Sequence, residues 1–318
     1  MKTEDTKNIP TLSIPLITQD DLYHNELWWL VTILACRILK EKNNRNETSN
    51  YVLEVYNIIR KIGNCISSIN QSKGFIHRRP SIKQLDNNDQ MTITGYYIYH
   101  YDVVVHKLST IRDLSYKLIN AICKLGLDDD CCKWQHIKNK ENQIPVSGIM
   151  NLQQLYYKLV EEIEKERNES THSGEIDLKF LIEIDLFVST SQAIRLYNIP
   201  LHEGWDPMEK GSYNERLLHK KKKELLERIE HFQNITIFFI HALSCCLNNV
   251  FRNNLPDNFK IEFKKEFDHA NDIINKYEKK NNKLIDIIDW LLDLDEAVKI
   301  LHEQRIKLGK KSYFKYYE

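Results

Sequence analysis

The amino-acid sequence predicts an all-α protein, because turn-forming residues are scarce and apolar residues recur at helical spacing. Only 9 glycines and 7 prolines occur among 318 residues, which disfavours folds that need many tight turns. Apolar side chains instead recur at intervals of three and four residues over long stretches of the chain, which is the period of an amphipathic helix. We therefore expect long helices packed as a bundle.

Three long helices are expected in the first part of the chain. A cap signal at Thr18–Asp21 predicts a helix that runs to Ile38. A second helix is expected to place apolar residues from Val52 to Ile62 on one face. The basic and polar stretch Ser72–Asn88 is expected to form a loop, and a long helix follows from about Tyr97 to Leu125.

The later part of the chain is expected to continue as helices joined by short connectors. One helix begins near Ile149, and we interpret Arg167–Gly174 as its junction with a further helix over Ile176–Ile194. The stretch Tyr197–Gly211 is rich in proline and glycine, and two helices are expected on either side of Pro256. We therefore divide the chain into an N-terminal extension (1–18), a helical bundle (19–200) and a C-terminal antiparallel helical hairpin (201–318).

Charge and cysteine content narrow the class of protein. Basic and acidic residues both total 45, so the formal net charge is zero and any contact with nucleic acid is expected to be local. No apolar run reaches the roughly 20 residues that cross a bilayer, and the polar N-terminus does not resemble a secretion signal. Seven cysteines, an odd number, lie mostly in apolar helical stretches, as expected of reduced thiols. We predict a cytoplasmic protein without membrane contact.

No metal or cofactor site is expected. Cys131, Cys132 and His136 lie close together in the sequence, but adjacent cysteines lack the spacer typical of a zinc site and no second pair follows. The sequence also lacks a phosphate-binding loop, a dinucleotide-binding fingerprint and a His-Glu-x-x-His zinc helix. The sequence therefore contains no motif that supports most of the common enzyme classes.

One short segment combines residue types suited to cleaving a phosphodiester. Residues 167–172 read Arg-Asn-Glu-Ser-Thr-His, which resembles the signature of the HEPN superfamily of helical bundles: an Arg and a His separated by about four to six residues, often with a polar residue directly after the Arg. Asn168 occupies that polar position. The resemblance covers the motif and, more loosely, the helices from Tyr97 to Ile194, so the predicted bundle is HEPN-like.

The resemblance implies a metal-independent endoribonuclease that acts on RNA as a homodimer. The 2′-OH attacks the neighbouring phosphate and leaves a 2′,3′-cyclic phosphate and a 5′-OH. His172 is expected to transfer a proton, because imidazole populates both protonation states near neutrality. Arg167 is expected to stabilise the negative charge that develops on the phosphate. One His cannot serve as base and acid at once, so two facing motifs in a dimer would complete the site.

Other residues are expected to support this site. Asn168 is expected to orient His172 or to hold a phosphate oxygen, and Ser170 and Thr171 to line the site. Arg78 and Arg79, in the expected loop beside Phe75 and His77, are candidate phosphate contacts. The family resemblance also implies a toxin or antiviral-defence role, with an antitoxin or regulatory protein as a further partner.

The competing interpretation is a non-catalytic helical protein that serves as an interaction or RNA-binding scaffold. The string Arg45–Asn50 is nearly the same hexapeptide but ends in Asn, and Arg195 and His202 also satisfy the spacing. The basic run Lys220–Lys223 is followed by glutamates and is expected to form a solvated helix face. His100, His106 and His241 lie in apolar helical stretches, where histidines with satisfied nitrogens at the core or its boundary are the default.

Overall fold

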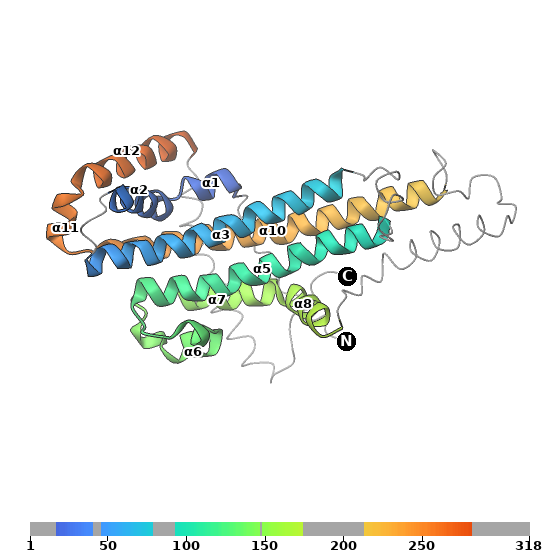
Figure 1. Cartoon of the computed structure of the whole chain (residues 1–318), viewed down its shortest axis with the longest axis horizontal. Coiled ribbons are helices and arrows are strands. Elements are labelled where there is room, and N and C mark those ends of the chain that lie inside the picture. Colours follow the sequence, from blue (N-terminus) through green and yellow to red (C-terminus); the bar gives the residue numbers. More distant parts are fainter. Residues whose placement is uncertain (1–16, 41–45, 79–92, 147, 174–212, 282–318) are drawn as a thin grey trace, which may run out of the picture. The chain divides into compact units, whose positions relative to one another are not determined.

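The computed structural model describes residues 17–40, 46–78, 93–146, 148–173 and 213–281, and these ranges contain helices and turns but no strand (Figure 1). The all-α prediction is therefore confirmed. The α-helices are α1 (Gln19–Tyr23), α2 (Glu26–Lys40), α3 (Glu47–His77), α5 (Ile93–Cys123), α6 (Trp134–Asn139), α7 (Gly148–Leu159), α8 (Glu161–Ser173), α10 (Tyr213–Asn253), α11 (Asp257–Glu262) and α12 (Lys264–Asn281). Two short 3-10 turns, Asp129–Cys131 and Glu141–Gln143, flank α6.

The chain divides into two compact units, each assembled from separate stretches. The first unit comprises residues 1–56, 119–156 and 237–318, and the second comprises 57–118 and 157–236. The long helices α3, α5 and α10 each contribute to both units. The boundary expected at residue 201 lies outside the described residues, so the linear division of the chain stays a prediction.

Two helix ends differ from the sequence prediction, each for a local reason. The first expected helix is broken into α1 and α2, because the Asn25 side chain accepts a hydrogen bond from the backbone N–H of Leu27 and starts a new helix (3.0 Å). Thr18 caps α1 as expected, in a reciprocal capping box with Asp21. The loop prediction was wrong for Ser72–His77, since α3 continues through them and buries Ser72 and Ile76.

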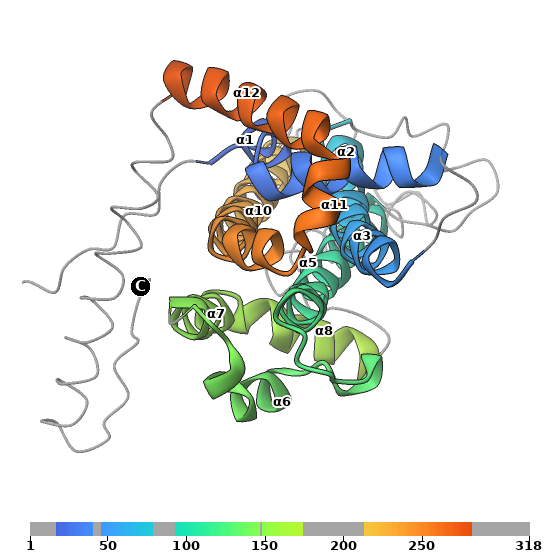
Figure 2. The ribbon, with the colours of Figure 1, turned by 90° about the vertical axis from the view of Figure 1, so that its left-hand side faces the viewer.

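In the first unit, α2 packs against both arms of the C-terminal hairpin. The indole N–H of Trp28 donates to the Ser244 hydroxyl of α10 (3.0 Å). On the other side, the Arg37 guanidinium donates to both carboxylate oxygens of Glu266 in α12 (2.8 Å each), and α2 and α12 run beside one another in Figure 2. The helices expected on either side of Pro256 are observed as α10 and as the pair α11 and α12, which are separated at Phe263.

Among the described residues, one helix is long and apolar enough to cross a membrane by length and composition alone. This stretch of α10, Arg216–Asn253, has most of its apolar window buried within the protein. The buried core helix of a globular protein meets the same criterion, and residues such as Phe239, Leu243 and Leu247 are almost fully buried. The expectation of a protein without membrane contact stays a prediction.

Candidate functional site

The motif residues 167–172 lie within the last two turns of α8, in the second unit. Residues 167–173, expected at a junction, are helical, and the break between helices falls at Val160, between α7 and α8. Gly174 and the helix expected over Ile176–Ile194 lie outside the described residues. A helix turns by about 100° per residue. Arg167 and His172 are five positions apart, so their side chains leave α8 about 140° apart around its axis.

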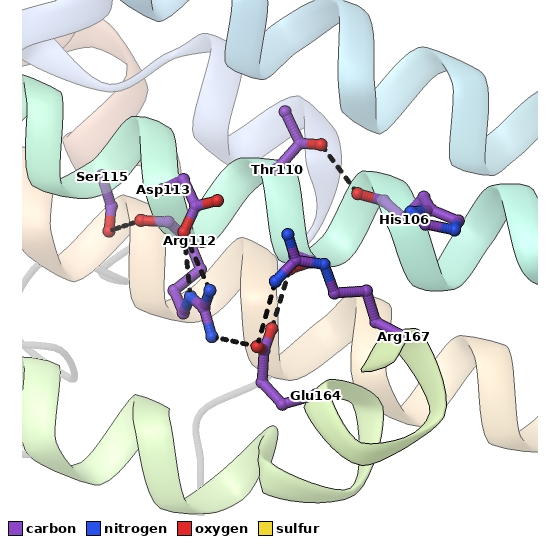
Figure 3. Close-up of polar contacts among 8 residues, drawn as sticks. His106, Thr110, Arg112, Asp113, Ser115, Glu164 and Arg167 are labelled. Atoms are coloured by element: carbon purple, nitrogen blue, oxygen red, sulfur yellow. Dashed lines mark hydrogen bonds and ion pairs between the residues drawn. The ribbon is translucent and has the colours of Figure 1, made fainter. Parts of the chain in front are cut away.

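The Arg167 guanidinium is held beside a carboxylate that also binds a second arginine. Its Nη1 lies 3.7 Å from the Oε2 of Glu164, one turn earlier on α8. The same Oε2 lies 2.5 Å from the guanidinium of Arg112 on α5, and Figure 3 shows both arginines pointing toward Glu164. The Ser109 hydroxyl donates to the other oxygen of Glu164 (2.8 Å). Glu164 therefore joins the motif helix to α5.

The two arginines of this cluster differ in exposure. The side chain of Arg112 is only 12% exposed, whereas that of Arg167 is 36% exposed. Burial disfavours the charged form of Arg112, but the carboxylates of Asp113 and Glu164 more than offset it, and the pKa of Arg112 is raised. Arg112 thus binds Glu164 from the protein interior, while Arg167 remains open on one side to a ligand.

A second polar contact follows one turn later along α8. The hydroxyl of Ser170, which is buried, donates to Oδ1 of Asp102 on α5 (2.5 Å). The Nε2 of His106 lies 3.5 Å from both the Ser170 hydroxyl and the same Asp102 oxygen. Ser170 was expected to line the site, and the structure places it between the motif helix and an Asp–His pair.

On another side of α8, a half-buried arginine of α10 anchors the helix. Arg228 donates to Oε1 of Glu166 (2.7 Å) and to the phenol oxygen of Tyr101 (2.8 Å), whose hydroxyl donates to Oε2 of Glu166 (2.7 Å). Burial is the main cause of the raised pKa of Tyr101, so this hydroxyl stays protonated and can donate. Together with the Glu164 cluster, these bonds fix α8 on two sides.

The remaining motif residues lie at the surface. Asn168, Thr171 and His172 are exposed, and the hydroxyl of Thr171 donates to the backbone carbonyl oxygen of Arg167 within the helix (2.8 Å). His172 stands in the last turn of α8. Its imidazole is therefore accessible to a substrate or to a second protein chain.

Arg78 lies at the end of α3 beside an exposed group of aromatic rings, which we call the aromatic cluster: Phe75, Tyr96, Tyr99 and His100. The rings of Phe75 and His100 are stacked, with centroids 4.9 Å apart, and Tyr96 and Tyr99 meet His100 edge-on. Arg78 is exposed and close enough to Tyr96 to act on its pKa. Arg79, the other expected phosphate contact, lies outside the described residues.

The described ranges contain no group of three or more His, Cys, Asp or Glu side chains placed to hold a metal ion. Cys132, which is adjacent to the partly exposed Cys131, is buried. The expectation of a site without metal stays a prediction.

The contacts of Glu164 lead to a prediction about stability. Glu164→Gln should destabilise the protein by about 1–3 kcal/mol, because it leaves the Arg112 guanidinium, which is mostly shielded from solvent, with one carboxylate partner, Asp113, in place of two. The measurement is the free energy of unfolding in urea. A matched control is Glu161→Gln, which breaks the exposed ion pair with Lys165 on the same helix (3.2 Å) and should leave the unfolding midpoint unchanged. Equal losses in both variants would contradict a special role for Glu164.

Comparison with known proteins gives one match. Residues 51–202 match the family model described as HEPN_Cthe2314-like HEPN. No curated protein and no solved structure matched the chain. The matched segment includes most of α3, all of α5, α7 and α8, and the complete Arg167–His172 motif.

Proposed function

This chain belongs to the HEPN superfamily through its residues 51–202, and from that premise we propose that it is a metal-independent endoribonuclease. The observation that carries the proposal is the environment of Arg167 and His172 within the matched segment. Arg167 is paired with Glu164 and partly exposed, and His172 is exposed in the last turn of the same helix. A guanidinium and an accessible imidazole are groups that support cleavage of RNA through its own 2′-OH.

In the proposed reaction, the 2′-oxygen forms a bond to phosphorus and the bond from phosphorus to the 5′-oxygen breaks. The guanidinium of Arg167 donates to the phosphate oxygens, on which negative charge increases in the transition state. His172 transfers one of the two protons, and the exposed Asn168 contacts a phosphate oxygen. The products are a 2′,3′-cyclic phosphate and a 5′-OH.

We propose that the active protein is a homodimer. Since Arg167 and His172 leave α8 about 140° apart, one copy of the motif does not direct both groups to the same point. A second copy allows Arg167 of one chain to meet His172 of the other in one cleft. A toxin or antiviral-defence role, with a regulatory protein as partner, is proposed by analogy with the family alone.

The aromatic cluster is the surface that we assign to RNA bases. Phe75 and Tyr99 are 46% and 56% exposed, so part of each ring is available to a ligand. Exposed rings beside a cation are the chemistry that binds single-stranded nucleic acid, because bases stack on the rings and phosphates bind the cation. Arg78 is the cation beside Tyr96.

Tyr99→Ala should therefore raise KM for single-stranded RNA by about tenfold and leave kcat nearly unchanged, since stacking on one ring is worth about 1–3 kcal/mol. Steady-state cleavage of a short fluorescent RNA measures both constants. Tyr23→Ala is the matched control, because Tyr23 is an exposed tyrosine of the first unit. An unchanged KM in Tyr99→Ala would remove the aromatic cluster from the substrate site.

The direct test of the proposed activity is the identity of the product ends. The purified protein should cut single-stranded RNA in the presence of EDTA and leave 2′,3′-cyclic phosphate, detected by mass spectrometry. An RNA with a single 2′-deoxyribose at the cleaved position should resist cutting there, because it lacks the nucleophile. Products with a 5′-phosphate, or equal cutting of the 2′-deoxy substrate, would contradict the mechanism.

A further inference from the structure

His106 of α5 lies on the side of the motif helix that carries Arg167. Residues three apart on a helix are neighbours on its surface, so Glu164, Arg167 and Ser170 follow one another along one side of α8. Glu164 contacts Ser109 and Arg112 of α5, and Ser170 contacts Asp102 and His106. Arg167 is therefore flanked along α5 by the turns that bear Arg112 and His106, as Figure 3 shows.

His106 is anchored on one edge and open on another. Its Nε2 lies 3.5 Å from Oδ1 of Asp102 and 3.5 Å from the hydroxyl of Ser170. The hydroxyl of the buried Ser170 donates to the same Asp102 oxygen, which fixes that carboxylate against the motif helix. The side chain of His106 is nevertheless 42% exposed. A positioned imidazole with an accessible edge is suited to proton transfer.

We propose that His106 is the second proton-transfer group of the ribonuclease site, and that it acts as the base. The proposal rests on the proposed function. It supplies a second proton-transfer group on the same chain as Arg167, which the single histidine of the motif cannot provide. Neutral His106 takes the proton of the 2′-OH as the 2′-oxygen bonds to phosphorus. The bond to the 5′-oxygen breaks, and protonated His172 of the partner subunit gives its proton to that oxygen.

The carboxylate of Asp102 accounts for the assignment of the base role to His106. A base becomes an imidazolium during the reaction, and a nearby carboxylate stabilises that cation. His172, in contrast, is exposed in the last turn of α8, where it can reach a substrate bound to a second chain. The geometry therefore assigns the base role to His106 and leaves the acid role to His172.

The position of His106 also fits the surface assigned to the RNA bases. Tyr99 and His106 are seven positions apart on α5, which places them on nearly the same side of the helix and about 10 Å apart along its axis. Asp102 lies between them on that side. A strand that stacks on the aromatic cluster can therefore reach His106 within one or two nucleotides.

The test uses the full chain, two histidine variants and two substrates. His106→Ala and His172→Ala should each lower kcat on ordinary single-stranded RNA by about a hundredfold or more. The second substrate carries sulfur in place of the 5′-oxygen at one cleavage site. Because a thiolate leaves without being protonated, this substrate should restore His172→Ala to nearly the wild-type rate and leave His106→Ala impaired.

Asp102→Asn tests the same assignment without removing the ring. The amide oxygen can still accept from Ser170, so the contact with α8 is kept while the charge beside His106 is lost. A fall in kcat of about tenfold is expected, with circular dichroism and the unfolding midpoint unchanged. His219→Ala, which removes an exposed histidine of α10 in the same unit, is the control for histidine loss and should be fully active.

The outcomes separate the inference from the function on which it rests. If the wild-type protein cuts RNA and His172→Ala does not, but His106→Ala keeps the wild-type rate, His106 is not catalytic and the nuclease assignment stands. If the sulfur substrate restores His106→Ala instead of His172→Ala, the base and acid roles are reversed and the inference is overturned. If the wild-type protein cuts no RNA, both fail. His106→Gln, which keeps a side chain of similar length, replaces His106→Ala if the latter does not fold.

Discussion

Replacement of His172 by alanine is expected to reduce the cleavage of single-stranded RNA by about 10²- to 10⁴-fold, which is the usual contribution of a general acid or base. The imidazole is exposed at the end of α8, so its loss removes a proton-transfer group without opening the core. The rate should be measured in EDTA with a short single-stranded RNA, under conditions in which the enzyme is in excess. The unfolding midpoint of the variant should match that of the wild type.

Two controls make this result specific. Lys165→Ala changes an exposed residue of the same helix, whose ammonium group pairs with Glu161, and it should remain active. His219→Ala removes another exposed histidine of the second unit. Full activity of the folded His172→Ala protein would contradict the assignment and place the cleavage site elsewhere.

The helices of this protein could be predicted wherever an apolar pattern was long and uninterrupted. The helix expected at about residues 97–125 is observed as α5, Ile93–Cys123. Its apolar residues recur at helical spacing, so that a helix buries them together on one face. The errors occurred where a polar residue starts a helix or lies buried inside one. Asn25 begins a new helix inside an apolar pattern, and Ser72 is buried within α3 although it lies in a polar stretch.

The motif residues could be found from the sequence, but their partners could not. Arg112 and Glu164 are 52 positions apart, and Ser170 lies 68 positions after Asp102. A single sequence contains no signal for such long-range pairing. Glu164 stands in a strongly charged stretch of the sequence, Glu161–Glu166, yet its side chain is only 13% exposed. The available hint was Arg112 itself, a charged residue between apolar residues of α5 that needs a buried counter-ion.

His106 illustrates the same limit. The sequence favours a boundary histidine with satisfied nitrogens, and the structure adds that its neighbours are an aspartate and the buried serine of the motif helix. The aromatic cluster was also only partly visible in the sequence. Phe75 and His77 were noted beside Arg78, whereas Tyr96, Tyr99 and His100 join this cluster only because α3 and α5 lie side by side in the second unit.

Arg167→Ala should lower kcat/KM for single-stranded RNA by about 10²- to 10³-fold, as expected for a donor that stabilises charge in the transition state. Arg167→Lys should recover only part of this loss, because an ammonium group keeps the charge but not the planar pair of donors. Stability should change little, since Arg167 is the more exposed arginine of the cluster and Arg112 still binds Glu164. A large fall in the unfolding midpoint would instead indicate a structural role.

Arg167→Ala and His172→Ala chains can also be mixed, to determine whether Arg167 and His172 of one site come from the same chain or from two chains. If Arg167 of one chain works with His172 of the other, a mixed dimer of Arg167→Ala and His172→Ala chains has one site with both groups intact and one with neither. Equal mixing makes half of the dimers mixed, so activity should return to about a quarter of the wild-type value. If both groups act within one chain, every site lacks one of them and the mixture stays inactive. The 140° separation of the two side chains around α8 favours recovery.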